Sequence, residues 1–366
     1  MSAASRLLPG LVLTAAVAWL GLAASGWIGK DFLGFEKSPV SGIMLAIVLG
    51  MVVGNVFRLP AVFAGGIKFS LVRVLRLGII LLGIRLGLGE ALKVGVVAIP
   101  LIVLCITAAG LITYWLGKRL ALPRRMSVLI AVGTSICGTT AIVATAPVIG
   151  AEDEETAYAV ANITVFGIVA MLFYPYLADA LFPGDAASAG RFLGTAIHET
   201  AQVAGSGLIH GQVFGGDTVL DVATVIKLVR NLFMVIVIPF LGYLYHRLSA
   251  SDKGSVEEVD VLGLFPLFIL GFVALAVVRT VGDATLESGS AFGLFDAAAW
   301  GDLTGEIKRW AERCLAVAMV GVGLGISVRQ LQGLGPKPFY VGLGAAVSVG
   351  VVSLLGIAGL NLLGVG

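Results

Sequence analysis

The sequence predicts an all-α polytopic membrane protein. Of its 366 residues, 58% are hydrophobic and only 13% are charged, whereas charged residues make up about a quarter of a soluble chain. A soluble protein with a mean hydropathy of +1.03 would have an apolar surface that only lipid tolerates. The 50 glycines favour the same class, because glycine is commoner in membrane helices than in soluble ones. Soluble enzyme classes are therefore excluded.

Seven stretches without Asp, Glu, Lys or Arg account for most of the predicted spans. Each is long enough to cross about 30 Å of hydrocarbon as a helix of roughly 20 residues. They cover residues 7–29, 38–57, 94–117, 126–151, 156–178, 261–278 and 338–366. Helices that carry charges are predicted at 69–88, 218–247 and 307–328, with a short helical segment at 192–209. We therefore predict about nine full spans plus two broken or re-entrant helices.

Two pairs of similar segments indicate an internal repeat. Residues 133–140, GTSICGTT, resemble 194–201, GTAIHETA, and residues 81–88 resemble 320–327. Weak self-similarity of this kind is typical of the inverted repeats of secondary transporters. The sequence therefore predicts a single transmembrane transporter domain built from two inverted repeats. Its parts are an extra N-terminal span at 1–29, repeat one at about 38–182 and repeat two at about 190–366.

Basic residues in two loops predict a cytoplasmic N-terminus, because positively charged loops face the cytoplasm. These residues are Arg58, Lys68, Arg73 and Arg76 after the second span, and Lys118, Arg119, Arg124 and Arg125 after the fourth. With this orientation, the repeats are inverted only if residues 126–150 and 192–209 each enter and leave the membrane on one side. We therefore expect two opposed broken helices or hairpins that meet near the midplane, where irregular backbone must line a cavity or be covered by protein.

The first broken segment holds a run of small polar residues suited to an anion. Its glycines let the helix unwind, and exposed amides and hydroxyls can then bind an anion beside the positive end of the next half-helix. The alternative is small-residue helix packing, in which Ser and Thr bond to their own helix. We favour binding because the matching segment is also polar. The candidate substrate contacts are Ser135, Cys137, Gly138, Thr139 and Thr140.

The second broken segment contains His198, Glu199 and Gln202. The pattern is similar to the zinc-protease motif His-Glu-x-x-His, but glutamine is a poor zinc ligand, so no metal site is predicted. His198 and Gln202 lie one helical turn apart and are candidate substrate contacts. An ionisable pair inside a membrane indicates function, and we predict that His198 and Glu199 couple transport to H⁺ or Na⁺. The alternative is an interfacial pair at the mouth of the hairpin.

Lys227 and Arg230 form a candidate anion site. They share one helix stripe, and a rise of about 1.5 Å per residue from the expected start of the helix places Arg230 past the middle of the bilayer. Buried cations are costly unless paired, and Glu199 neutralises only one of them, so we predict an anionic substrate. If Asp221 supplies a second partner, the cluster is structural. Arg85, flanked by glycines, either reaches the same cavity or snorkels to the outer interface.

These motifs together resemble the YeiH-like sulfate exporter family of bacterial inner-membrane proteins. The similarity runs along most of the chain. It is carried by LGIILLGIRL (77–86), GTSICG (133–138), AP (146–147), HETAQVA (198–204) and KLVR (227–230). The resemblance implies a plasma-membrane transporter related to the cation/proton antiporter, bile-acid and auxin transporter group, with broken helices that cross at the substrate site. It also implies an anionic substrate, sulfate or another sulfur oxyanion.

We therefore expect a secondary transporter, not an enzyme, that moves sulfate, another sulfur oxyanion or a sulfonate by alternating access. Its expected partners are membrane lipid, the anion and H⁺ or Na⁺, and a homodimer is left open. A formal charge of only +2 argues against nucleic acid. The absence of a Walker motif argues against direct ATP drive, and no cofactor is expected. Two alternatives stay open: an ion channel, and an intramembrane thiol enzyme or sensor with Cys137 as nucleophile and His198 as base.

Overall fold

The computed structural model describes residues 3–32, 38, 40–57, 59–248, 263–287, 289–326 and 335–364. The described residues are almost entirely helical and form no strand, which confirms the prediction of an all-α protein. Six helices are long and apolar enough to cross a membrane: Arg6–Gly29, Leu88–Arg119, Asp153–Leu181, Thr218–Tyr245, Phe268–Leu286 and Pro336–Leu362. The higher number of about nine full spans stays a prediction. Arg58 and residues 327–328, which the sequence analysis used, lie outside the described residues.

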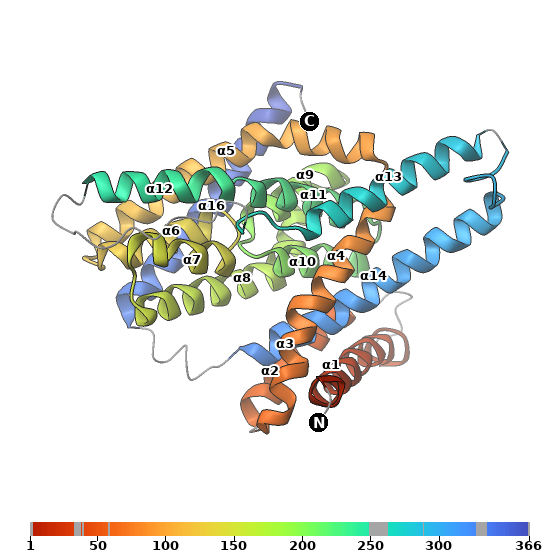
Figure 1. The fold of residues 1–366 in the computed structure, drawn as a ribbon, viewed down its shortest axis with the longest axis horizontal. Helices are drawn as coiled ribbons and strands as arrows, with labels where there is room; N and C mark the ends of the chain where they lie inside the picture. Colours follow the sequence, from red (N-terminus) through yellow and green to blue (C-terminus); the bar gives the residue numbers. More distant parts are fainter. Residues whose placement is uncertain are drawn as a thin grey trace. The chain divides into compact units, whose positions relative to one another are not determined.

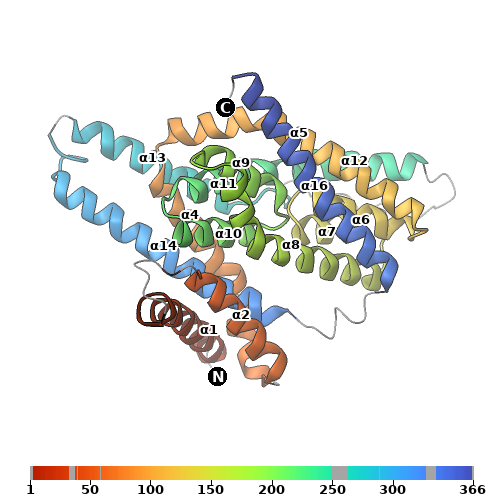
Figure 2. The same cartoon turned by 180° about the vertical axis from the view of Figure 1, so that it is seen from behind.

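Two compact units share the chain, and each is assembled from three separate stretches. Unit 1 contains Met1–Val94, Ala204–Asp221 and Leu267–Val328. Unit 2 contains Gly95–Val203, Val222–Pro266 and Arg329–Gly366. The path of the helices through the units can be followed from two opposite sides in Figure 1 and Figure 2. Each unit takes stretches from both predicted repeats. The division into units therefore does not test the repeats, which stay a prediction.

Unit 1 is built from helices that approach one another closely at glycine. Its elements are α1 (Ala3–Gly26), η1 (Trp27–Phe32), α2 (Gly42–Val56), η2 (Ala61–Phe63), α3 (Ala64–Phe69), η3 (Ser70–Val74), α4 (Leu75–Leu82), η4 (Gly83–Arg85), α13 (Phe268–Leu286) and α14 (Ala297–Gly325). A Cβ on Gly50 of α2 would lie 2.9 Å from the carbonyl oxygen of Val320 in α14. Glycine therefore sets the distance between these two helices, as is usual between membrane helices.

Unit 2 carries the first broken segment and the longest apolar helices. Its elements are α6 (Arg124–Ser135), α7 (Thr139–Thr145), η5 (Pro147–Ile149), α8 (Asp153–Leu181), α9 (Ala186–Ala196), α12 (Met234–Leu248) and α16 (Pro336–Leu362). Three further helices contribute residues to both units: α5 (Leu88–Arg119), α10 (Thr200–Val213) and α11 (Thr218–Leu232). Apolar side chains of α6, α7, α8 and α16 form one buried cluster of unit 2.

The helices α6 and α7 form a hairpin with its tip at residues 136–138. A Cβ on Gly133 would lie 2.7 Å from the side chain of Ile142, nine positions further along the chain. Near the open end of the hairpin, Met126 and Ile149 belong to the same buried cluster. A straight helix would hold these pairs far apart at about 1.5 Å per residue. The first segment is therefore a hairpin, whereas the path predicted for the second, which is broken between Ala196 and Thr200, stays a prediction.

Asp185 caps α9, the helix that leads into the second break. Its side chain accepts a hydrogen bond from the backbone N–H of Ser188 at 2.9 Å. Desolvation raises the pKa of the Asp185 carboxyl, but the hydrogen bonds from Ser188 outweigh it, so this pKa lies below its usual value. A lowered pKa gives stabilisation that is present above the unfolded-state pKa and is lost as the pH falls through the folded-state pKa.

We expect Asp185→Ala to lower the free energy of unfolding by about 1 kcal/mol at neutral pH, because α9 loses its N-cap acceptor. Asp185→Asn keeps an acceptor oxygen and should cost less. Thermal unfolding of the purified protein in detergent measures both effects. The difference between wild type and Asp185→Ala should shrink in acid, and a difference that grows in acid would contradict the cap.

Candidate functional site

Lys227 of α11 joins the two breaks inside unit 2. Its ammonium group donates hydrogen bonds to the carbonyl oxygens of Ile136, at 2.9 Å, and Ile197, at 3.1 Å, and to that of His198. The side chain is completely buried, with 0% exposed. Because an ammonium has three N–H donors, all of them are used by the backbone of the two breaks.

Arg230, one turn further along α11, binds the same two breaks. Its Nε donates to the carbonyl oxygen of Ser135 at 2.8 Å, and its Nη2 donates to that of Thr134 at 2.5 Å. Its Nη1 donates to the carbonyl oxygens of Thr195 at 2.6 Å and Ile197 at 3.3 Å. The guanidinium, with 0% of the residue exposed, therefore satisfies carbonyls at the ends of both α6 and α9.

The positions of these cations follow from the polarity of helices. The last carbonyls of a helix have no partner within the helix, and they form its negative end. The helices α6 and α9 both end inside unit 2, at Ser135 and Ala196, where unpaired carbonyls would be costly. Among the described residues, neither Lys227 nor Arg230 forms an ion pair with a carboxylate. Both side chains therefore act first as caps of the two half-helices.

Glu199 connects the second break to the start of α7. Its carboxylate accepts hydrogen bonds from the backbone N–H of Thr139 at 3.3 Å and from the hydroxyl of the same residue. Its own N–H donates to the side chain of Gln202 at 3.2 Å, and Gln202 donates to the carbonyl oxygen of Thr164 in α8 at 3.2 Å. The predicted residues Glu199, Gln202 and Thr139 are thus brought together.

Gly138 allows this contact by its conformation and its lack of a side chain. Its φ of +70° and ψ of −129° define a conformation that L-residues rarely adopt. A Cβ at this position would overlap the side chain of Glu199. Gly138, a predicted substrate contact, therefore allows the backbone turn at the hairpin tip and the close approach of Glu199.

Gly138→Ala is expected to lower the free energy of unfolding by about 2–5 kcal/mol, the sum of backbone strain and overlap with Glu199. Gly150→Ala is the matched control, because Gly150 also has a positive φ, +61°, but nothing lies within 4 Å of its Cβ position. Gly150→Ala should lower the free energy of unfolding only by the cost of the backbone conformation, about 1–2 kcal/mol. Denaturant titration of both variants measures the difference, and equal losses would show that the contact with Glu199 is unimportant.

His198 is buried at this site without a hydrogen-bond partner. It is 1% exposed, and neither ring nitrogen has a partner among the described residues. The hydroxyl of Ser135 and the side-chain oxygen of Asn231 are likewise buried and unpaired, although Asn231 donates from Nδ2 to the hydroxyl of Thr200 at 3.0 Å. Buried polar atoms without partners are costly, so each of these three side chains is a candidate contact for a bound solute. Asn231 lies four positions after Lys227, and this spacing places it on the same helix stripe as Lys227 and Arg230, which is its signal in the sequence.

Two of the predicted substrate contacts, Cys137 and Thr140, have surroundings that differ from those of Thr139. The sulfur of Cys137 lies 2.8 Å from the sulfur of Met234, in an apolar cluster that also contains Val132 and Ile136. Thr140 is exposed. No described contact therefore places a base beside the thiol of Cys137, and no observation favours the thiol-enzyme alternative.

Arg85 belongs to a separate ion-pair cluster of unit 1. Its guanidinium binds Asp217 at 2.6 Å, Asp221 at 2.5 Å and Glu312 at 3.2 Å. Asp221, the alternative partner for the cations of α11, therefore pairs with Arg85. Asp217 and Glu312 were missed by sequence reasoning, because nothing in the spacing of three distant segments indicates that they meet.

The site in unit 2 keeps a formal charge of +1. Lys227 and Arg230 each contribute a positive charge and Glu199 a negative one. Two negative helix ends, of α6 and α9, and two positive ones, of α7 and α10, meet here, so their partial charges offset one another. In a buried environment this excess favours an anionic solute over a neutral or cationic one.

Comparison with known proteins places the chain among bacterial membrane proteins. Residues 9–342 match the family model described as Conserved hypothetical protein 698. The UPF0324 membrane protein FN0533 of Fusobacterium nucleatum is 32% identical over 342 residues, which cover 92% of this chain and 96% of the relative. The UPF0324 membrane protein Cgl0015/cg0018 of Corynebacterium glutamicum is 33% identical over 320 residues, 87% of this chain and 85% of the relative. The similarity confirms a membrane-protein family, whereas the sulfate-exporter assignment stays a prediction.

Proposed function

Since this chain belongs to the Conserved hypothetical protein 698 family of UPF0324 membrane proteins, we propose that it is a secondary transporter of a small anion. The observation that carries the proposal is the buried formal charge of +1 at two helix breaks, together with unpaired polar atoms of His198, Ser135 and Asn231, which lie in or next to the segments that meet there. Breaks in membrane helices are tolerated where they line a solute path. The transporter works by alternating access and has no enzymatic activity.

The proposed substrate is a sulfur oxyanion such as sulfate, or a sulfonate. Such anions offer several acceptor oxygens, and the hydroxyl of Ser135, the imidazole of His198 and the remaining N–H of Arg230 are donors of the right kind. Lys227 has no donor left for the anion, so its charge acts at a distance. The resemblance of the motifs to sulfate exporters supports the same substrate class.

His198 and Glu199 are the proposed coupling groups. They are adjacent in the second break, and Glu199 also contacts the first break through Thr139. A proton taken up or released there changes the charge beside the anion. We further propose a location in the bacterial inner membrane with a cytoplasmic N-terminus, supported by the basic loops.

Exchange of labelled anions in proteoliposomes tests the proposed function. The purified protein should exchange labelled sulfate, sulfite or a sulfonate against the same unlabelled anion. Ser135→Ala should slow this exchange. Ser348→Ala is the matched control, because the hydroxyl of Ser348 is already bonded to the carbonyl oxygen of Ala345 at 2.8 Å. Movement of cations without any anion in the panel would refute the proposal.

A further inference from the structure

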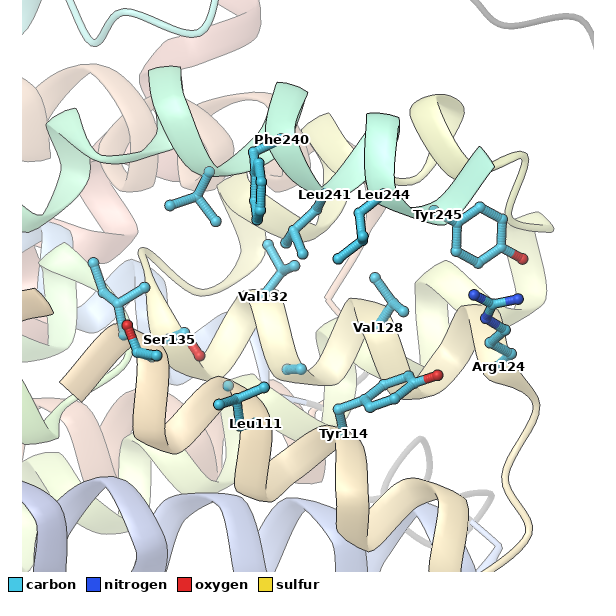
Figure 3. A pocket seen from close by; sticks show the side chains of 15 residues that line it. Leu111, Tyr114, Arg124, Val128, Val132, Ser135, Phe240, Leu241, Leu244 and Tyr245 are labelled. Atoms are coloured by element: carbon cyan, nitrogen blue, oxygen red, sulfur yellow. The ribbon is translucent and has the colours of Figure 1, made fainter. Parts of the chain in front are cut away.

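An apolar pocket of about 370 Å³ lies in unit 2 between α5, α6 and α12. Its volume is within the range of about 300–1,000 Å³ that is typical of ligand sites. The walls are aliphatic and aromatic, as Figure 3 shows for Leu111, Val128, Val132 and Leu241. A solute that fills it is therefore mainly hydrocarbon.

The two ends of the pocket differ in polarity. Arg124, Tyr114 and Tyr245 gather at one end, and Ser135 lies at the other (Figure 3). The guanidinium of Arg124 lies 4.8 Å from the centre of the Tyr245 ring. Arg124 and Ser135 are the first and last residues of α6, so the pocket extends along a helix about 16 Å long at 1.5 Å per residue. The pocket is thus long and apolar, with a cation at its mouth.

The side of the pocket is open. Leu111 of α5 and Phe240 of α12 line it and are 65% and 59% exposed. An open groove suits one chain of a two-chain lipid, because the second chain can remain in the bilayer.

We propose that this groove binds one acyl chain of an anionic phospholipid, whose phosphate contacts Arg124. Arginine binds phosphate with two parallel hydrogen bonds. Tyrosine rings favour the headgroup level of the membrane, and basic pockets between helices on the cytoplasmic side bind anionic headgroups. Arg124 follows a loop that its basic residues predict to be cytoplasmic. The proposal does not depend on the transported solute.

The inner end of the groove reaches the first break. Ser135 lines the groove, and its carbonyl oxygen accepts the hydrogen bond from Nε of Arg230. An acyl chain that fills the groove therefore contacts the tip that Arg230 holds.

Native mass spectrometry of the full-length protein in detergent tests the proposal with three probes: phosphatidylglycerol, phosphatidylcholine with the same acyl chains, and oleate. Phosphatidylglycerol should be retained best. Arg124→Gln should weaken its binding about 10-fold to 100-fold, the effect of losing a hydrogen bond to a charged group. Ala131→Phe, which fills the groove at a lining residue, should abolish it.

Matched controls separate this site from general charge and from misfolding. Arg119→Gln removes the same charge near the same loop, from a side chain that lies 5.1 Å from the Trp115 ring and does not line the groove, and it should leave binding unchanged. Val347→Phe adds the same ring to an exposed position of α16 and should also retain the lipid. Equal losses from Arg119→Gln and Arg124→Gln, equal retention of phosphatidylcholine, or retention of oleate alone would each overturn the proposal.

Discussion

Arg230→Met should lower the free energy of unfolding by about 3 kcal/mol or more and abolish anion exchange. The substitution removes the guanidinium that donates hydrogen bonds to the carbonyl oxygens of Thr134, Ser135 and Thr195. An unsatisfied buried carbonyl costs about 1–3 kcal/mol, and relief from burying a cation offsets part of this loss. Thermal and denaturant unfolding in detergent measure stability, and labelled-anion exchange in proteoliposomes measures activity.

Arg119→Met is the matched control for this prediction. Arg119 is exposed and contacts the ring of Trp115, so its replacement should change stability by less than about 1 kcal/mol. Arg230→Lys adds a second comparison, because lysine keeps the charge but not the fork of donors. If Arg230→Met unfolds like the wild type, the guanidinium does not hold the half-helix ends.

In the Glu199→Gln variant, exchange of the anion should persist. Uptake driven by a proton or sodium gradient should fall at least about 10-fold. The amide has the same shape, and its oxygen still accepts the hydrogen bonds of Thr139, so the tip should remain folded. An amide does not titrate, so the coupling step is removed. Uptake driven by imposed pH or sodium gradients, compared with exchange at equal concentrations, measures the two activities separately.

Glu154→Gln controls for the loss of one carboxylate. Glu154 is exposed in the first turn of α8, outside both breaks, and its replacement should leave both activities unchanged. Gradient-driven uptake that survives in Glu199→Gln would exclude Glu199 as the coupling group. Loss of exchange together with loss of the folded state would instead assign Glu199 a structural role.

Much of the fold follows from patterns that are local in the sequence. The long apolar stretches predict membrane helices because each must hide its own backbone from lipid. The glycine-rich run before Thr140 predicts the first break, and the structure has it at residues 136–138. The depth of Lys227 and Arg230 predicts buried cations, and both are completely buried.

The partners of the charged side chains, in contrast, follow from the packing of helices. Lys227 and Arg230 bind backbone carbonyls, which every residue carries, so no side-chain pattern in the sequence identifies them. Arg85 binds carboxylates from two distant segments, whose proximity depends on how helices pack. Helix formation is governed by neighbours in the chain, whereas these contacts join residues brought together by folding. The positions of the charges and breaks can therefore be read from the chain, and what they bind depends on the folded arrangement.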